Sequence, residues 1–280
     1  MRQKTINVKG ALVSIESPLV MGILNITPDS FYAGSRKQTE ADVTKRIETI
    51  LQEGGQIIDI GGYSSRPDAD DVSPKEETAR LAFALKILNR HYPDAIVSVD
   101  TFRADVARRC VEEYGAAIIN DIAGGELDSG MFQTVAALQV PYIMMHMRGT
   151  PQTMQQFTVY NDLIADIRKY FSDKVYRLEQ MGVNDIILDP GFGFSKTIEQ
   201  NYQLMRRLND FSIFGLPLLA GISRKAMIYK YLGTTPSESL NGTSILNTLA
   251  LLNGADILRV HDVKEAAEAV KIVSKYNNTL

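Results

Sequence analysis

Eight apolar runs in this chain each end in a polar or charged residue, and each is followed by a segment with the pattern of a helix. The eight end residues are Asn25, Asp59, Asp100, Asn120, His146, Asp189, Ser223 and Arg259. Runs such as 57–60 and 95–100 have the near-continuous hydrophobicity of parallel strands that are covered on both faces. Because a buried, unpaired carboxylate is costly, a series of such ends indicates one shared polar site at one end of a sheet.

The order of the elements predicts a (β/α)8 TIM barrel with a short N-terminal β-hairpin over residues 3–17. The strands are expected at 18–25, 56–61, 95–100, 116–120, 140–146, 185–189, 217–222 and 255–260. An open doubly wound sheet is the alternative, since it uses the same right-handed strand–helix units.

The helices between these strands carry clear start and stop signals. Ser73 is a candidate N-cap, followed by Pro74 at the first helical position and by a capping-box Glu76. Asp262 is expected to cap the last helix in the same way. Four glycines that follow helical patterns are expected to end helices in the left-handed conformation: Gly54, Gly115, Gly182 and Gly254.

Length and composition favour a single domain over residues 1–280. Hydrophobic residues make up 45% of the chain and charged residues 22%, and no linker-like or low-complexity stretch divides it. A formal net charge of −3 provides no field to attract nucleic acid, so any anion must be bound locally.

Residues 1–17 lack the apolar core of a signal peptide and no run is long enough to cross a membrane, so a cytoplasmic protein without a membrane partner is expected. The single Cys110 excludes disulfides within the chain, and its apolar neighbours predict a buried, inert thiol.

Oxygen atoms and cations both gather at the expected mouth of the barrel. The loop 25–31 carries amide, hydroxyl and carboxylate oxygens that suit Mg²⁺, although a turn ahead of Pro28 also explains it. Cations that can grip a phosphate, or that are ordinary surface charge, are Arg66, Lys196, Arg224, Lys225, Arg259 and His261. Arg259 and His261 point to one side if the last strand extends that far.

Asp100, Asn120 and Asp189 are the most specific polar group in the sequence. A heterocycle with an aminopyrimidinone edge presents a row of N–H donors, which carboxylates and an amide oxygen can accept. The glycines and rings of 191–194 can approach such a flat heterocycle closely, and a simple turn explains them equally well.

Residues 21–31 (MGILNITPDSF) and 57–67 (IIDIGGYSSRP) resemble the two signature segments of the dihydropteroate synthase family. The similarity continues in order through 98–101, 119–121, 145–147, 189–194, 223–225 and 259–262. The resemblance implies a pterin-binding barrel that condenses 6-hydroxymethyl-7,8-dihydropterin diphosphate with 4-aminobenzoate. The products would be 7,8-dihydropteroate and pyrophosphate. It also implies a target of sulfonamides, and a homodimer is expected.

The resemblance assigns a role to each site residue. Asp100, Asn120, Asp189 and Lys225 would hold the pterin, with Ile122 and Met145 packed near its ring. Asn25 would contact Mg²⁺, while Arg259, His261 and the loop bearing Ser65 and Arg66 would meet the diphosphate. Ser65, Pro67, Phe194 and Lys225 would frame the aminobenzoate. Lys225, Arg259, His261 and Asp100 would carry the catalysis.

Three departures from the family pattern affect the peripheral contacts: Ala33 stands where Asp is usual, Tyr63 where Glu is common, and Ala226 where Ser is frequent.

The nearest rival enzyme is a pterin-dependent methyltransferase, which needs no diphosphate site. A noncatalytic pterin-binding paralogue is the rival from another class, and it should have lost Asn25, Lys225 or the Arg259–His261 pair.

Overall fold

Eight parallel strands form a nearly closed barrel in the computed structural model, which describes residues 5–26, 36–63 and 72–278. Their order around the sheet is β8-β7-β6-β5-β4-β3-β10-β9. A bridge between Leu188 and Leu218 and a hydrogen bond from Leu188 N to Pro217 O join β8 to β9 and complete the ring. The predicted barrel is therefore confirmed, and the open doubly wound sheet is excluded because each strand pairs with its neighbour in the chain.

The strands are β3 (Leu19–Asn25), β4 (Ile57–Gly61), β5 (Ile96–Asp100), β6 (Ile118–Asp121), β7 (Tyr142–Met145), β8 (Ile186–Asp189), β9 (Leu219–Ala220) and β10 (Ile257–Val260). The expected strands are all present, and most begin one or two residues later than predicted. The seventh, β9, has only two residues, and β10 ends at Val260 as predicted. His261 therefore lies beyond the strand, and strand alternation does not extend to it as the sequence had allowed.

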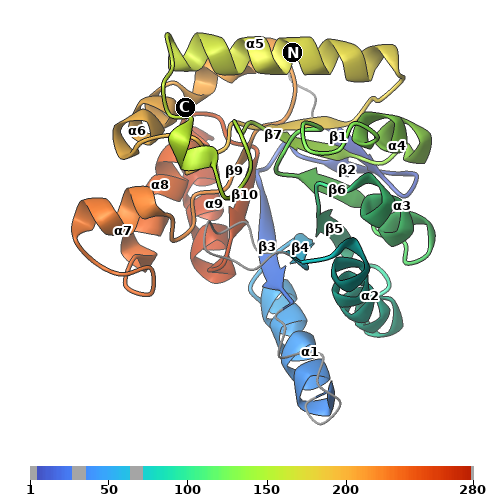
Figure 1. The fold of residues 1–280 in the computed structure, drawn as a ribbon. Helices are drawn as coiled ribbons and strands as arrows, with labels where there is room; N and C mark the ends of the chain where they lie inside the picture. Colours follow the sequence, from blue (N-terminus) through green and yellow to red (C-terminus); the bar gives the residue numbers. More distant parts are fainter. Residues whose placement is uncertain (1–4, 27–35, 64–71, 279–280) are drawn as a thin grey trace.

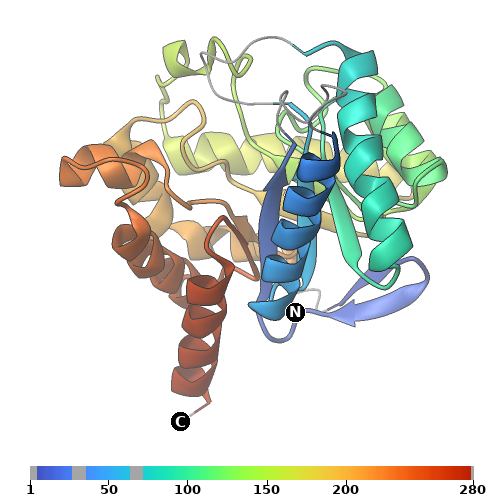
Figure 2. The same ribbon diagram turned by 90° about the horizontal axis from the view of Figure 1, so that it is seen from below.

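Helices surround the strands (Figures 1 and 2). They are α1 (Arg36–Gln52), α2 (Pro74–His91), α3 (Ala104–Glu112), α4 (Met131–Leu138), α5 (Leu163–Gln180), α6 (Ile198–Arg206), α7 (Ala226–Leu232), α8 (Leu240–Leu252) and α9 (Val263–Asn277), with short 3-10 helices at Met154–Gln156 and Leu208–Phe214. Within the described ranges, none of these helices is long and apolar enough to cross a membrane.

Most of the expected helix ends are confirmed. Ser73 Oγ accepts a hydrogen bond from Glu76 N at 3.2 Å, and Pro74 occupies the first turn of α2. The four predicted glycines have φ between 67° and 95°. Asp262 is the exception: it stands at the N-cap of α9 but its side chain caps no backbone N–H. Its carboxylate instead binds Arg224 at 2.8 and 2.9 Å, because two charge-assisted bonds outweigh one cap.

The predicted N-terminal hairpin is confirmed and closes one end of the barrel. Strands β1 (Thr5–Val8) and β2 (Ala11–Ser14) are antiparallel and are joined by Lys9 and Gly10, which have φ of 52° and 84°. A two-residue turn with both φ values positive matches the twist of a hairpin. The buried Ile6, Val8 and Ile15 pack against the start of the barrel strands, so the hairpin covers the end opposite to the strand C-termini.

Inward-facing side chains fill the barrel in layers. Residues from six strands form the lower layer beneath which the hairpin packs: Met21, Ile57, Ile118, Ile143, Ile187 and Ile257. The larger core lies between the outer faces of the strands and the helices. Because side chains alternate along a strand, the residue two positions after each inner-layer residue also points inward, one layer closer to the mouth.

Candidate active site

The layer above the buried isoleucines is polar. Asp59, Asn120, Asp189 and Arg259 each lie two residues after an isoleucine of the lower layer. All four are inside one barrel mouth, as the sequence predicted for strand ends. Asp59, Asn120 and Asp189 are almost fully buried, with 0%, 3% and 5% exposure.

Arg259 joins three strands in this layer. Its Nε donates to Asp59 Oδ2 at 2.6 Å and its Nη2 donates to Asp100 Oδ2 at 2.6 Å. Asn120 Nδ2 donates to the same Asp59 oxygen at 3.1 Å. Burial raises the pKa of Asp100 to about 7, with Arg259 acting in the opposite direction and Asp59 in the same one. Although burial alone would lower the Arg259 pKa, Asp59 and Asp100 raise it above its ordinary value.

Asp59 is the residue that the sequence analysis left out of the site. It ends an apolar run, as the other polar strand ends do, but the family motif assigns it no contact. Asp59 is the only charged residue within 57–60. Because a carboxylate in a buried strand needs a cationic partner, this charge could have marked Asp59 as a site residue. The structure shows that this partner is Arg259.

Asp189 and Lys225 lie on the other side of Arg259. Asp189 Oδ1 accepts from Gly191 N at 2.8 Å, while Lys225 Nζ donates to Phe192 O at 2.6 Å. A Cβ added to Gly221 would lie 3.7 Å from Lys225 Nζ and 3.9 Å from both Asp189 Oδ2 and Arg259 Cβ, so the three groups converge on this glycine. Burial raises the pKa of Asp189 and lowers that of Lys225 to about 8, and the attraction between the two groups opposes both shifts.

An apolar wall completes the mouth. Ile122, Met145 and Phe194 belong to one buried cluster that also contains Ala123, Met147 and Met154 and is separate from the main cores. Lys225 Nζ lies 4.6 Å from the centre of the Phe194 ring, within reach of a cation–π interaction. The structure therefore brings these three sequence-predicted residues together beside Lys225.

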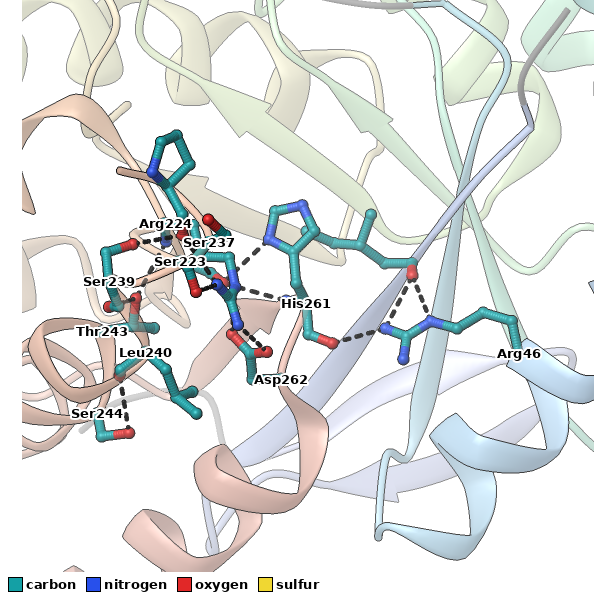
Figure 3. Close-up of polar contacts among 12 residues, drawn as sticks. Arg46, Ser223, Arg224, Ser237, Ser239, Leu240, Thr243, Ser244, His261 and Asp262 are labelled. Carbon is teal, nitrogen blue, oxygen red and sulfur yellow. Dashed lines mark hydrogen bonds and ion pairs between the residues drawn. The ribbon is translucent and has the colours of Figure 1, made fainter. Parts of the chain in front are cut away.

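His261 lies at the exposed edge of the site, where α1 meets the end of β10 (Figure 3). Its Nδ1 is 3.0 Å from Ser223 Oγ, and Arg46 Nη2 donates to its carbonyl oxygen at 2.7 Å. Arg46 also donates to Ile23 O, which ties the ends of β3 and β10 to α1. Loss of hydration and the charge of Arg259 lower the His261 pKa to about 4, so the ring is neutral at pH 7.

Two of the cations grouped by sequence are engaged by the protein instead of facing the mouth. Arg224 binds Asp262 and donates to the carbonyl oxygens of Pro236 and Ser237 (Figure 3). Lys196 is buried and donates to two loop carbonyls. The expectation that these two side chains grip a phosphate is wrong, because both are enclosed by acceptors that the sequence does not reveal.

Comparisons with known proteins agree with this geometry. Residues 21–261 match the model of the family described as pterin binding enzyme. The chain is 41% identical to dihydropteroate synthase of Escherichia coli over 95% of its length and 94% of that protein. A crystal structure of Yersinia pestis dihydropteroate synthase with a sulfonamide drug complex is 37% identical, has a TM-score of 0.90, and covers 99% of this chain and 100% of that one. A structure of the Xanthomonas albilineans enzyme with 4-aminobenzoic acid is 33% identical, has a TM-score of 0.88, and covers 99% of both chains.

The chain belongs to the pterin binding enzymes. Within them it falls in the dihydropteroate synthase family, as the two signature segments indicated.

Several residues that the family resemblance assigns lie outside the described ranges. These are Ser65, Arg66 and Pro67, together with the unusual Ala33. The other two departures are described. Tyr63 packs edge-on against Phe102, with ring centres 5.2 Å apart, and accepts a hydrogen bond from Gln152. Ala226 is the first residue of α7.

Asn25 is exposed at the end of β3, and a Cβ added to Gly61 would lie 3.2 Å from its Oδ1. The described residues hold no group of three or more His, Cys, Asp or Glu side chains that could bind a metal ion. One amide oxygen is a suitable ligand for Mg²⁺ when phosphate and water oxygens supply the others. The residues present therefore fit a metal that is held mainly by substrate.

Cys110 is fully buried on α3, and burial raises its pKa to about 12. The predicted burial of this thiol is confirmed, and a thiol with such a pKa carries almost no thiolate at pH 7.

Proposed function

We propose that the mouth of the barrel joins the pterin methylene carbon of 6-hydroxymethyl-7,8-dihydropterin diphosphate to the nitrogen of 4-aminobenzoate, with release of pyrophosphate. The chain is a transferase of folate synthesis, as its dihydropteroate synthase relatives are. The observation that carries the assignment of residues is the buried polar layer of Asp59, Asn120, Asp189 and Arg259, bordered by the apolar wall.

The pterin ring would lie between this layer and the wall. Asp189, Asn120 and Asp100 would accept its N–H groups, and Lys225 would donate to its carbonyl side. Ile122 and Met145 supply the flat apolar contact. Lys225 is suited to two tasks, because its ammonium already lies against both the loop carbonyl of Phe192 and the ring of Phe194.

The diphosphate would meet the open edge of the mouth. Arg259 uses Nε and Nη2 for Asp59 and Asp100, so we assign Nη1 to the leaving anion. His261 uses Nδ1 for Ser223, so its Nε2–H would donate to a phosphate oxygen. Ser65 and Arg66 would add contacts from their loop. Mg²⁺, held by Asn25 and phosphate oxygens, would neutralise charge on the leaving group.

The second substrate would bind between Lys225, Phe194, Ser65 and Pro67. Two solved structures of relatives support this position of the second substrate. One contains 4-aminobenzoic acid, and the other contains a sulfonamide drug complex. A sulfonamide carries the same aniline ring para to an acidic group, so we propose that it competes for this position.

In the reaction, the C–O bond to the diphosphate breaks as the pterin ring delocalises the developing cation, and the aniline nitrogen forms the C–N bond. Arg259 and His261 stabilise the departing anion, which is the electrostatic contribution that usually dominates. The aniline is nucleophilic when neutral, and its extra proton leaves to water after the bond forms. No strong general base is needed.

Pyrophosphate release tests this function. We expect release that depends on 4-aminobenzoate, requires Mg²⁺ and is inhibited competitively by a sulfonamide. A pterin-dependent methyltransferase or a noncatalytic paralogue would release no pyrophosphate under the same conditions. Full activity in excess chelator would rule out a role for Mg²⁺ but would not contradict the condensation reaction.

A homodimer is also part of the proposal. Ile245, Leu249 and Leu252 are 53%, 40% and 48% exposed on one stripe of α8, although the opposite face of this helix is buried. Ile272 and Tyr276 extend the exposed apolar surface on the adjoining α9. An exposed apolar stripe of this kind is normally covered, and a second copy of the chain is the covering partner that we propose.

We therefore expect Leu249→Glu to convert a dimer into a monomer at micromolar concentration, as measured by sedimentation velocity. Leu12→Glu is the matched control, because Leu12 is 74% exposed on the hairpin, away from α8. An unchanged sedimentation coefficient for Leu249→Glu would show that this face is not the interface. Location in the cytoplasm stays a prediction.

A further inference from the structure

The loop between Asp189 and α6 has few backbone partners of its own and is held mainly by side chains. Asn201 Oδ1 accepts from Gly193 N at 2.7 Å, and Tyr160 OH donates to Ser195 O at 2.9 Å. Lys225 holds Phe192 O from the side of the mouth. Gly191 has φ of 74° and approaches β7 so closely that a Cβ would lie 2.1 Å from His146 O. The loop therefore takes its shape from the residues that surround it.

Lys196 holds this loop from the opposite side. Its side chain is 3% exposed, and Nζ lies 2.9 Å from Gly191 O, 3.0 Å from Phe194 O and 3.1 Å from His146 Nδ1. Burial lowers the pKa of Lys196 to about 7, and the attraction of Asp189 opposes that shift. Three acceptors surround Nζ, which matches the three N–H donors of the ammonium form.

His146 fits the role of acceptor. Burial, Lys196 and Arg148 lower its pKa well below the ordinary value, so the ring is neutral and a bare Nδ1 can accept from Lys196. Its backbone N also donates to Asp189 O at 2.9 Å. Lys196 and His146 thus join the ends of β7 and β8 beneath the two residues, Asp189 and Phe194, that the proposed function assigns to different substrates.

The two ends of the loop are not held equally. Asp189 is the last residue of β8, and its backbone is held within the barrel, where Asp189 O accepts from His146 N at 2.9 Å. Phe194 is five residues further on, outside any strand or helix, and its carbonyl is bound directly by Lys196. Loss of Lys196 should therefore displace Phe194 more than Asp189.

We propose that Lys196 is a positioning residue that orients the ring of Phe194 toward the second substrate by binding the carbonyl oxygens of Gly191 and Phe194. This inference rests on the proposed function, in which Phe194 forms one side of the 4-aminobenzoate site. Lys196 itself touches neither substrate.

The test is steady-state kinetics of Lys196→Met in the full chain, with pyrophosphate release as the signal. We expect the KM for 4-aminobenzoate to rise about tenfold, because the carbonyl oxygens of Gly191 and Phe194 both lose the hydrogen bond that holds the loop. The Kd for the pterin diphosphate, measured by calorimetry, should change less than about threefold. A sulfonamide should lose affinity in parallel with 4-aminobenzoate, because it uses the same ring contact.

Lys174→Met is the matched control. Lys174 is also a buried lysine, with 5% exposure, and its Nζ donates to the loop carbonyl of Gly124 at 2.8 Å. Its loss should lower thermal stability without a selective rise in the KM for 4-aminobenzoate. If Lys196→Met does not fold, Lys196→Gln retains two N–H donors and should shift the KM in the same direction by a smaller factor.

An unchanged KM for 4-aminobenzoate in a folded Lys196 variant would overturn the inference, as would equal losses for both substrates. Failure of the proposed function would look different, because the unsubstituted protein itself would then release no pyrophosphate.

Discussion

Asp189→Asn should weaken binding of the pterin diphosphate by about 2–4 kcal/mol, between roughly thirtyfold and several hundredfold in Kd. The reason lies in how the two oxygens of this carboxylate are used. Oδ1 accepts from Gly191 N at 2.8 Å, and Oδ2 lies on the side of Gly221 and Lys225. An asparagine must keep its oxygen toward Gly191 N–H, so its NH2 group would replace Oδ2. The outward position then becomes a donor that faces the Lys225 ammonium and the N–H groups of the pterin.

Calorimetry on the pterin diphosphate measures this effect, and binding of 4-aminobenzoate to the preformed complex should change far less. Asp121→Asn is a matched control on β6, two strands away from β8. Both Asp121 oxygens are occupied by protein donors: Oδ1 by Ala123 N, and Oδ2 by Tyr142 OH and Gly125 N. This control should lower stability without a comparable loss of pterin affinity. If Asp189→Asn bound the pterin normally, Asp189 would not belong to the site.

Arg259→Ala should cost both stability and rate. The substitution leaves the carboxylates of Asp59 and Asp100 without the guanidinium that each contacts at 2.6 Å, and Asp59 is completely buried. Removal of one partner from a buried ion pair typically costs about 3–5 kcal/mol. Turnover should fall more than binding of a pterin that lacks the diphosphate, because Arg259 is assigned to the leaving anion.

The stability loss should depend on pH. The Asp100 pKa is already raised to about 7 by burial, and loss of Arg259 removes an interaction that lowers it. A carboxyl with a raised folded-state pKa binds more protons in the folded chain than in the unfolded chain. Its contribution to stability is therefore largest at low pH and is lost as the pH rises through that pKa. Urea unfolding should accordingly show a smaller difference between variant and unsubstituted protein at pH 5.5 than at pH 8.

Arg224→Ala provides the comparison for this experiment. Arg224 also binds an aspartate through two hydrogen bonds, but its partner Asp262 is partly exposed, whereas the Arg259 partner Asp59 is completely buried. The Arg224 variant should lose less stability and show little dependence on Asp100 titration. Equal losses at both pH values for Arg259→Ala would mean that Asp100 does not need this arginine as a charge partner.

The sequence by itself determined the barrel and most of the residues at its mouth. Apolar runs with polar ends depend on local periodicity, so Asp100, Asn120, Asp189 and Arg259 could be placed at one end of the sheet before any contact was known. Ser73 and the helix-ending glycines were equally readable, because a cap involves residues within one turn. The family segments then added Ile122, Met145 and Phe194, which the structure places in one wall.

Only the tertiary structure decided which charges meet. Closure of the barrel sets β10 beside β3, with β4 on the other side of β3, and this brings Arg259 to Asp59, 200 positions earlier in the chain. The same closure turns Arg224 toward Asp262, so the carboxylate that looked like a helix cap is used elsewhere. The sequence made Lys196 a candidate phosphate-binding cation. In the folded protein, its ammonium group binds two loop carbonyl oxygens instead. Periodicity and caps act between near neighbours and can be read along the chain, whereas the partner of a buried charge depends on distant segments that meet only when the barrel is closed.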